Sequence, residues 1–383
     1  MSQKEKILIC GILPPPYFGH SAMYKILMES SFVGAFDITF LDMKFWTYAQ
    51  HKKISLVKLL KLVKYLGQFI FLIAVKRPRY VLYNMSFDKM PFLKDFLFCF
   101  IGKICGRRIV IHDMGQYIRE LYQSCGKVHQ ALIRWLLKNA TACIVLGEGT
   151  KTVYEGLIEP GRLFAVPGSV EDSREGAVAG SVRDPRRDVN VLYFSYMSQS
   201  KGVLTAFQAA EKVLNNNYAI RFIFAGPVES ETVQKAYDDF SRRFPTRVRH
   251  LGYIGDVDQR TAVYRDADIF IFPTLRDVFG LVLLHAMAEA LPVIASREGT
   301  IPEIIKDGEN GFLVPKGDDQ QLAQRILQLA ADPRLRADMG AANRQRYLQC
   351  YSPRVYGQNM IKAFEGIQQL FQGHKHESCA CGR

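Results

Sequence analysis

The stretch DIFIFPTLRDVFGLVLLHAMAEALPVIAS, residues 268–296, indicates the fold of this chain. An apolar run of Ile and Phe ends at Thr274, and a short loop leads into a helical pattern from about Gly280 to Ala290. A second apolar run, LPVIAS (291–296), follows the helical pattern directly. Continuous apolar runs that alternate with helices are typical of parallel strands covered on both faces of a sheet.

The same alternation extends along the chain and predicts a doubly wound α/β fold. The apolar runs expected to be buried strands are 6–13, 79–85, 107–113, 142–148, 189–195, 220–226, 247–254, 268–274 and 291–296. The charged stretch 171–188 has no periodic apolar face, so we expect a linker there, between an N-terminal domain (1–170) and a C-terminal domain (189–350). Segment 351–383 is expected to form a helix that packs back on the N-terminal domain, followed by a flexible tail.

The composition is that of a folded protein with an anionic partner. The 383 residues are 48% hydrophobic and 23% charged, which is enough for two hydrophobic cores. The formal net charge of +13 favours nucleic acid, a nucleotide phosphate or an acidic membrane as the partner. We expect no nucleic acid, because the chain has neither zinc-finger spacing nor interleaved aromatic and basic residues.

The cysteines and the chain ends favour a cytoplasmic protein. Eight cysteines show no pairing rhythm, which is typical of reduced thiols in the cytosol. The apolar start of the chain runs into prolines without a cleavage site, and no segment reaches the ~20 apolar residues that span a bilayer. The tail is expected to be frayed, although four of its residues could hold a metal: His374, His376, Cys379 and Cys381.

Candidate ligand-binding residues follow the expected strands, at the edge where open α/β sheets bind ligands. Gly19 lies between the first strand and a helical pattern, so backbone N–H groups there could face an anion. His112 and Asp113 end a strand, and a lone histidine there is either a satisfied structural residue or a ligand contact. Lys201 lies between a strand and a helix, where it is either a solvated side chain or a phosphate contact.

Two further polar side chains belong to the opening stretch. Asp277 lies near the start of its helix, and His285 lies in the second turn. Together with the motifs SKG, AGP, LGYI, ADIFIFPT, IPEII and NGFLVP, in that order, they make the chain resemble the retaining glycosyltransferases of family 4, also called glycosyl transferases group 1. The resemblance covers nearly the whole chain and is strongest from Val189 to Pro315. It implies the GT-B fold, in which two Rossmann-like, doubly wound domains face a central cleft that binds a nucleotide-sugar.

The resemblance implies a role for each matched residue. The loop with Gly19 and His20 brings backbone amides to the diphosphate of the donor. His112 touches the sugar ring near the reacting carbon, and Lys201 holds the diphosphate. Asp277 matches the first acid of a Glu-x7-Glu element and contacts the donor sugar. Three of these, His112, Lys201 and Asp277, are the expected catalytic residues.

The same resemblance assigns the remaining donor contacts. Tyr253 and Ile254 would contact the base. His285 stands at the second acid of the Glu-x7-Glu element and would bind the ribose hydroxyls, which an imidazole can do through either ring nitrogen. The backbone along the sugar and phosphates would be that of Phe279, Gly280 and Leu281.

Departures from the family pattern bear on activity. Many members carry an arginine five residues before the lysine, where this chain has Tyr196. Lys201 and backbone amides would then stabilise the leaving diphosphate alone, and losing one such contact can cost ~3–4 kcal/mol. Arg276 could compensate. The first loop has His20 in place of a second glycine, and both acids of the Glu-x7-Glu element are altered.

A basic segment of the first domain, residues 51–79, predicts an amphipathic helix. One helical face carries Leu56, Leu59, Leu60, Val63, Leu66 and Ile70, and another carries Lys58, Lys61, Lys64 and Gln68. Such a helix can lie in an anionic membrane surface, and the following segment 90–108 adds apolar and basic residues. The alternative is a core helix of the first domain with a solvated lysine stripe.

The resemblance implies a metal-independent retaining glycosyltransferase that needs no cofactor. It would move a sugar from a UDP or GDP donor to a lipid-linked or other oligosaccharide acceptor at the cytoplasmic face of a membrane, in cell-surface polysaccharide or glycolipid assembly. The bond to the diphosphate would break through an oxocarbenium-like state, with the acceptor hydroxyl attacking from the same face. The alternatives are a non-catalytic homologue that binds a membrane or a partner enzyme, and a GT-B epimerase or phosphorylase.

Overall fold

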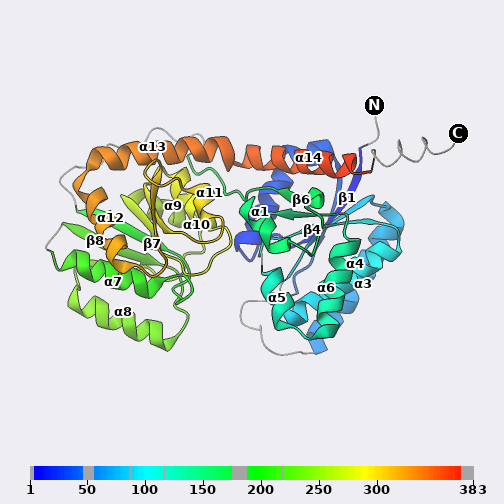
Figure 1. Ribbon diagram of the computed structural model, residues 1–383, viewed down its shortest axis with the longest axis horizontal. Coiled ribbons are helices and arrows are strands. Elements are labelled where there is room, and N and C mark those ends of the chain that lie inside the picture. The colour runs from blue at the N-terminus through cyan, green and yellow to red at the C-terminus, as the bar shows by residue number, and fades with distance from the viewer. Residues whose placement is uncertain are drawn as a thin grey trace. The chain divides into compact units, whose positions relative to one another are not determined.

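The computed structural model describes residues 4–45, 56–86, 88–115, 117–174, 188–216 and 219–371. It divides into two compact units (Figure 1). Unit 1 comprises Met1–Gly168 and Pro353–Arg383, and unit 2 comprises Ser169–Ser352. Each unit is built on its own six-stranded sheet in which every paired strand runs parallel, so both have the expected doubly wound α/β architecture.

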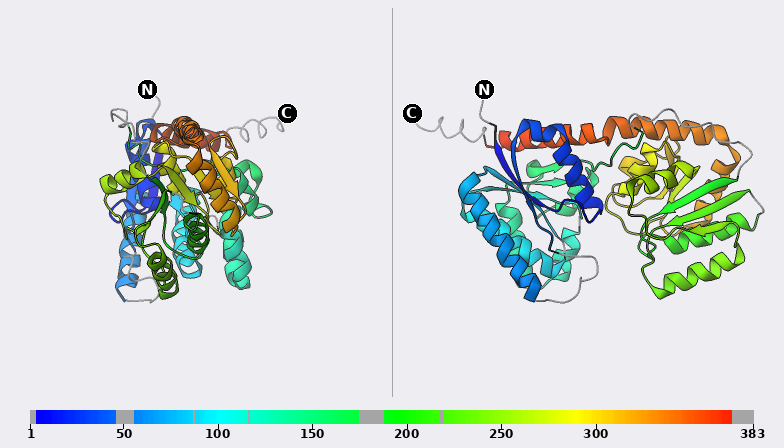
Figure 2. Two further views of the ribbon diagram at one scale, coloured as in Figure 1. Left: turned by 90° about the vertical axis from the view of Figure 1, so that its left-hand side faces the viewer. Right: turned by 180° about the vertical axis from the view of Figure 1, so that it is seen from behind.

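The sheet of unit 1 has the strand order β2-β1-β3-β4-β5-β6. Its strands are β1 (Lys6–Gly11), β2 (Asp37–Asp42), β3 (Tyr80–Asn84), β4 (Arg108–His112), β5 (Ala142–Val145) and β6 (Leu163–Ala165). Its α-helices are α1 (Gly19–Glu29), α2 (Ser31–Ala35), α3 (Leu56–Lys76), α4 (Lys89–Ile104), α5 (Ile118–Ser124), α6 (Lys127–Asn139) and α14 (Pro353–Gln369). One face of the sheet shares a core with α3, α4 and α6, while α1, α2 and α14 lie on the other side (Figures 1 and 2).

The sheet of unit 2 has the strand order β12-β11-β10-β7-β8-β9. Its strands are β7 (Val189–Phe194), β8 (Ile220–Ala225), β9 (Val248–His250), β10 (Ile269–Phe272), β11 (Val293–Ser296) and β12 (Gly311–Val314). Its helices are α7 (Val203–Leu214), α8 (Glu231–Arg243), α9 (Val257–Asp266), α10 (Leu281–Ala288), α11 (Ile301–Ile304), α12 (Asp319–Ala331) and α13 (Pro333–Cys350). A core of buried side chains joins the sheet to α7, α8 and α12.

Each of the nine apolar runs expected as strands contains one, so those predictions are confirmed. The strands β2, β6 and β12 were not expected. Strand β2 has the alternating sequence DITFLD and lies at the edge of its sheet, where only one of its residues is buried. Strand β6 (LFA) has only three residues, and strand β12 (GFLV) begins at a glycine.

The segments expected to be a linker and a C-terminal helix are described in part. Residues 171–174 belong to unit 2, where Asp172 binds Arg344 at 2.6 Å and Arg174 binds Glu289 at 3.0 Å. The rest of the expected linker, 175–187, lies outside the described residues. Helix α14 packs on α1 and α2 within unit 1. The tail, which is expected to be frayed and has four residues that could hold a metal, also lies outside the described part of the chain.

Helix α3 corrects the expected amphipathic pattern. The side chains that pack on the core of unit 1 are Leu62, Tyr65, Leu66, Phe69, Leu72 and Ile73. The residues expected to form one apolar face are largely exposed: Leu56, Leu59, Leu60, Val63 and Ile70. Leu66 is the exception among them. The helix therefore has a second apolar face beside the one that it buries, which a single amphipathic pattern does not describe.

The segment after α3 is also more buried than its sequence suggested. Phe92, Phe98 and Cys99 lie in the core, and Phe96 and Phe100 pack on Trp135. The apolar residues of α4 are thus mainly core residues, with Met90 and Ile104 exposed at its two ends.

Two further observations concern thiols and membrane crossing. The cysteines within the described residues are free thiols, and most are buried. Among the helices that the structure describes, none combines the length and apolarity that a bilayer crossing requires.

Candidate functional site

Two loops of unit 2 meet at the carboxyl edge of its sheet. The loop after β7 and the loop after β10 are joined by backbone hydrogen bonds, because the Ser200 carbonyl accepts from Leu275 N at 2.9 Å and from Arg276 N at 3.0 Å. The Thr274 hydroxyl donates to the same carbonyl at 3.1 Å. The neighbouring strands β7 and β10 are paired in the sheet, so their loops emerge side by side. This edge is where parallel α/β sheets bind ligands.

Gly202 makes this junction possible. Its backbone is left-handed, with φ at +71°, and a Cβ atom placed there would lie 1.7 Å from the Pro273 carbonyl oxygen. The loops could not approach each other with any other residue at this position. The approach brings Lys201, next to Gly202, to the start of helix α10.

The junction forms an ion pair between Lys201 and Asp277. Lys201 Nζ lies 2.5 Å from Asp277 Oδ2 and 3.3 Å from the carbonyl oxygen of Arg276. The other carboxylate oxygen, Oδ1, accepts from the backbone amides of Phe279 at 3.1 Å and Gly280 at 2.9 Å. Both oxygens of Asp277 are therefore engaged. A lysine ammonium has three N–H donors, so one remains for an anion beside this pair.

His285 lies on α10, the helix that follows Phe279 and Gly280, whose amides hold Asp277. Its ring is partly buried and tilts by 33° against the ring of Tyr264, with the centroids 5.7 Å apart. Burial, and secondarily the positive charge of Arg260, lowers the pKa of His285 to about 3. The imidazole is therefore neutral at physiological pH, and no described residue forms a hydrogen bond with its ring nitrogens.

The other expected donor contacts of unit 2 lie on loops of the same edge. Tyr253 follows β9 and is 69% exposed, with its ring against Gly255. Ile254, next to it, is partly buried. The loop is held near β8, because Gly226 N donates to the carbonyl of Gly252 at 2.8 Å. An exposed aromatic ring on a fixed loop can stack on a flat ligand group.

Tyr193 positions the lysine loop and was missed in the sequence. This buried residue of β7 donates its hydroxyl proton to the carbonyl oxygens of Tyr196 and Lys201, both at 3.2 Å. Tyr196, where an arginine was expected, contributes its backbone to the loop in this way. A tyrosine within an apolar strand run gives no sign of such a role.

The candidate residues of unit 1 gather at the carboxyl edge of its own sheet. His112 is fully buried, and its Nδ1 lies 3.1 Å from the hydroxyl of Tyr24 on α1. Burial, and then the nearby His20, lowers the pKa of His112 to about 3. The Asp113 carboxylate accepts from the Tyr154 hydroxyl at 2.5 Å and from Gly115 N at 2.8 Å.

The first loop of unit 1 adjoins His112. Gly19 is exposed and begins α1, and the ring of the next residue, His20, is hydrogen-bonded to the backbone of Met114. Burial lowers the pKa of His20 as well. The loop after β1 is thus linked to the loop after β4 through His20 and Met114. Helix α1, which follows the first of these loops, is linked to the end of β4 through Tyr24 and His112.

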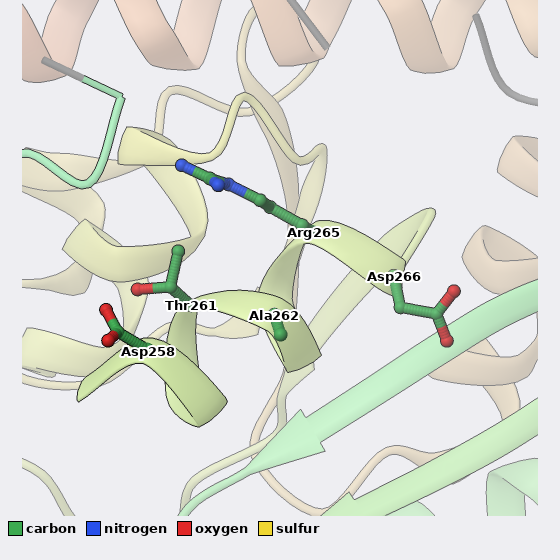
Figure 3. A pocket seen from close by; sticks show the side chains of 5 residues that line it. All are labelled: Asp258, Thr261, Ala262, Arg265 and Asp266. Atoms are coloured by element: carbon green, nitrogen blue, oxygen red, sulfur yellow. The ribbon is translucent and has the colours of Figure 1, made fainter. Parts of the chain in front are cut away.

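A hollow along helix α9 contains none of the residues expected at the site (Figure 3). Asp258, Thr261, Ala262, Arg265 and Asp266 line it. Arg265 also binds the buried carboxylate of Glu289 at 3.3 Å, so this side chain holds the end of α10. Within the described ranges, no group of three or more His, Cys, Asp or Glu side chains is arranged to hold a metal ion.

Comparison with known proteins bears on the segment of unit 2 that contains Lys201 and Asp277. Residues 188–332 match the family described as glycosyl transferases group 1. The capsular polysaccharide biosynthesis glycosyltransferase CapM of Staphylococcus aureus is 27% identical over 181 residues, which are 47% of this chain and 47% of that protein. The chain thus spans about half the length of the curated relatives that it matches.

Solved structures resemble the chain over nearly its whole length. Sucrose-phosphate synthase from Thermosynechococcus elongatus has a TM-score of 0.72 at 18% identity, and the match covers 97% of this chain and 100% of that one. Anabaena Alr3699/HepE in complex with UDP-glucose has a TM-score of 0.67 at 16% identity, with 94% and 99% covered. The fold is therefore GT-B, an α/β fold of two Rossmann-like domains.

The junction of the two loops generates a stability prediction. We expect Gly202→Ala to destabilise the protein by at least ~2 kcal/mol, because the methyl group forces the loops apart in addition to straining the backbone. Gly252→Ala is the matched control, since Gly252 has φ at +68° with open space around it and pays only the ~1 kcal/mol of backbone strain. Urea unfolding measures both. Equal losses for the two variants would contradict the close contact.

The buried imidazole of His112 generates a prediction for pH. Its pKa is lower in the folded protein than in the unfolded chain, so the unfolded chain binds more protons as pH falls below ~6.5. The free energy of unfolding should therefore decrease as pH falls, and the contribution of His112 to this slope should approach ~1.4 kcal/mol per pH unit. We expect His112→Gln to lose less stability than the wild type between pH 6.5 and pH 5, measured by urea unfolding. Parallel curves for the two proteins would contradict a neutral buried His112.

Proposed function

We propose that this protein is a glycosyltransferase that moves a sugar from a nucleotide-diphosphate donor to a glycan acceptor in polysaccharide or glycolipid assembly. The Lys201–Asp277 pair at the carboxyl edge of unit 2 carries the proposal, since it places a cation with a spare donor where such sheets bind ligands. The segment that matches glycosyl transferases group 1 includes both residues.

The donor diphosphate would take the place of Asp277 as the partner of Lys201. A diphosphate carries more charge than a carboxylate, and a lysine holds phosphate as a mobile point charge. The amides of Phe279 and Gly280, which now bind Asp277, lie at the start of helix α10, where N–H groups favour anions. These groups would stabilise the leaving diphosphate without a metal ion, which is part of the proposal.

The proposed stereochemical course is retention, with attack by the acceptor on the face that the diphosphate leaves. The departing phosphate oxygen would then remove the proton of the acceptor hydroxyl. Lys201 would hold that oxygen in place during the transfer.

The nucleotide would be held by side chains that the structure leaves available. Tyr253 offers an exposed ring for the base, with Ile254 beside it. The neutral imidazole of His285 can bind a ribose hydroxyl as a donor or an acceptor, through either nitrogen. Anabaena Alr3699/HepE, which has a similar fold, was solved with UDP-glucose, and we propose UDP as the nucleotide to test first, with GDP beside it.

The acceptor is proposed to be lipid-linked and held at an anionic membrane. The exposed face of α3 includes Leu60 and Val63, which are 61% and 63% exposed. Lys61 and Lys64 lie at the margin of this face, and apolar residues flanked by lysines suit the boundary between lipid headgroups and acyl chains. The protein would act as a peripheral protein on the cytoplasmic side of that membrane.

The donor site is tested by calorimetric titration of the full chain with UDP and with GDP in EDTA. We expect the wild type to bind one of them with micromolar affinity. Lys201→Ala should bind it at least about tenfold more weakly than the wild type, because a charged hydrogen bond contributes ~1.5–3 kcal/mol. Lys235→Ala is the control, since Lys235 is an exposed lysine of α8 in the same unit. If the wild type binds neither nucleotide, the non-catalytic alternative holds instead.

The membrane contact is tested by co-sedimentation with phosphatidylcholine vesicles, with and without phosphatidylglycerol. We expect binding to the anionic vesicles, and at least about tenfold weaker binding in the double variant Leu60→Glu/Val63→Glu, because buried CH₂ groups contribute ~0.8 kcal/mol each. Leu348→Glu, at an exposed leucine of α13, should bind as the wild type does. Equal binding by all three proteins would contradict α3 as the contact surface.

A further inference from the structure

Three lysines of unit 1 gather where the loop after β2 meets α3 and α4. Lys44 belongs to that loop, Lys61 to the second turn of α3, and Lys94 to the second turn of α4. Lys61 Nζ donates to the carbonyl oxygen of Lys44 at 3.2 Å. Lys94 Nζ lies 4.7 Å from the centroid of the Phe45 ring, the residue after Lys44. The three lysines thus meet at two consecutive residues of one loop, and we call them the lysine cluster.

The lysine cluster lies at the carboxyl edge of its sheet. Strands β1, β2 and β3 run parallel, so the loops that follow them emerge at the same edge. Lys44 lies two residues beyond the end of β2. Asp42, the last residue of β2, accepts from Leu13 N in the loop after β1 at 3.1 Å. The lysine cluster is therefore on the side of the sheet where α/β folds bind ligands.

A buried carboxylate fixes Lys94 in place. Asp95 is fully buried and accepts from the Tyr83 hydroxyl at 2.8 Å and from Ser86 N at 2.8 Å. The same carboxylate forms an ion pair with Lys94, whose side chain remains 15% exposed. An ammonium group has three N–H donors, so Lys94 can bind a ligand as well. Because the side chain is already held, less conformational entropy is lost on binding.

The lysine cluster carries more positive charge than its carboxylates neutralise. Lys44 pairs with Asp42 at 3.1 Å, and Lys94 pairs with Asp95. The described partner of Lys61 is a neutral carbonyl, so no carboxylate within the described ranges balances its charge. Three lysines and two carboxylates leave a surplus of one positive charge among these five side chains. A phosphate group suits such a place, because it is anionic and its oxygens can accept from more than one lysine.

An exposed apolar surface adjoins the lysine cluster. Tyr65 of α3 accepts from Lys44 N through its hydroxyl at 3.1 Å, so the first half of the helix lies beside the loop after β2. The same half of α3 carries exposed apolar side chains on both sides of Lys61 in sequence: Leu56, Val57, Leu59, Leu60 and Val63. A ligand bound here can therefore have an apolar chain next to an anionic group.

A lipid that carries a phosphate group matches both parts of this surface. We propose that Lys44, Lys61 and Lys94 bind the phosphate or diphosphate through which the acceptor sugar is linked to its lipid. The lipid chain contacts the start of α3, and the phosphate oxygens accept from the three ammonium groups. This proposal rests on the proposed function for the sugar acceptor. It adds that the link between sugar and lipid is an anionic phosphate ester.

The anionic group is tested by calorimetric titration of the full chain with n-decyl phosphate and with n-decyl β-glucoside, each below its micelle concentration. The two probes share an apolar chain and differ in charge. We expect the wild type to bind n-decyl phosphate at least about tenfold more tightly, because hydrogen bonds to a charged group are stronger than neutral ones. Equal affinity for the two probes overturns the proposal.

The lysines are tested with Lys44→Gln/Lys61→Gln, which leaves the buried carboxylate of Asp95 paired. We expect this variant to bind n-decyl phosphate about tenfold more weakly than the wild type and n-decyl β-glucoside unchanged. Lys127→Gln/Lys138→Gln is the matched control, since it removes the same charge from two exposed lysines of α6. Equal losses in the two double variants would make net charge the cause and overturn the proposal.

The place of binding is tested with Lys201→Ala, which removes the proposed donor lysine of unit 2. This variant should bind n-decyl phosphate as the wild type does. A tenfold loss in Lys201→Ala, with none in Lys44→Gln/Lys61→Gln, would place the phosphate at the donor site and overturn the proposal. These titrations contain no nucleotide, so failure of the wild type to bind UDP or GDP contradicts the proposed function separately.

The source of the phosphate is tested by co-sedimentation with phosphatidylcholine vesicles that contain phosphatidylglycerol. Phospholipid headgroups offer the lysines the same chemistry as the acceptor does. We expect Lys44→Gln/Lys61→Gln to keep most of its vesicle binding and to lose affinity for n-decyl phosphate. Loss of vesicle binding with unchanged affinity for n-decyl phosphate would assign the lysines to membrane headgroups and overturn the proposal.

Discussion

The candidate site depends on one close contact, that of Gly202 with the carbonyl of Pro273. A residue with a side chain cannot occupy position 202, because its Cβ would lie 1.7 Å from that oxygen. The contact lets the loops after β7 and β10 share hydrogen bonds to Ser200 and places Lys201 against Asp277. The buried hydroxyl of Tyr193 supports the same loop from below. The ion pair is thus a consequence of backbone packing in the core of unit 2.

Charge is distributed unequally between the two candidate regions. In unit 2, a lysine and a carboxylate neutralise each other, and we propose that an anion of higher charge displaces the carboxylate. In unit 1, burial lowers the pKa of His20 and of His112, so these two rings offer hydrogen bonds as neutral groups. A charged diphosphate matches the first region, and an uncharged sugar hydroxyl matches the second. Both matches are of the kind that a nucleotide-sugar and its acceptor require.

Much of the fold was predictable from sequence because parallel strands buried on both faces are continuous apolar runs. The edge strand β2 lacked such a run. The exposed face of α3 could not be assigned, since Leu60 and Phe69 are equally apolar and only the sheet decides which is buried. Lys201 and Asp277 could be predicted from the sequence, because each follows an expected strand and belongs to a motif of the family that the chain resembles. Tyr24 and Lys44 were missed, because their contacts are hydrogen bonds across 88 and 17 residues of sequence.

The most direct test of the central claim is a crystal structure of the full chain with UDP, grown in EDTA. A diphosphate oxygen within hydrogen-bond distance of Lys201 Nζ, about 2.8 Å, with the ammonium shared or withdrawn from Asp277, is the predicted result. A diphosphate bound elsewhere, with the Lys201–Asp277 pair intact at its present 2.5 Å, would contradict the proposal that this ion pair is the donor site.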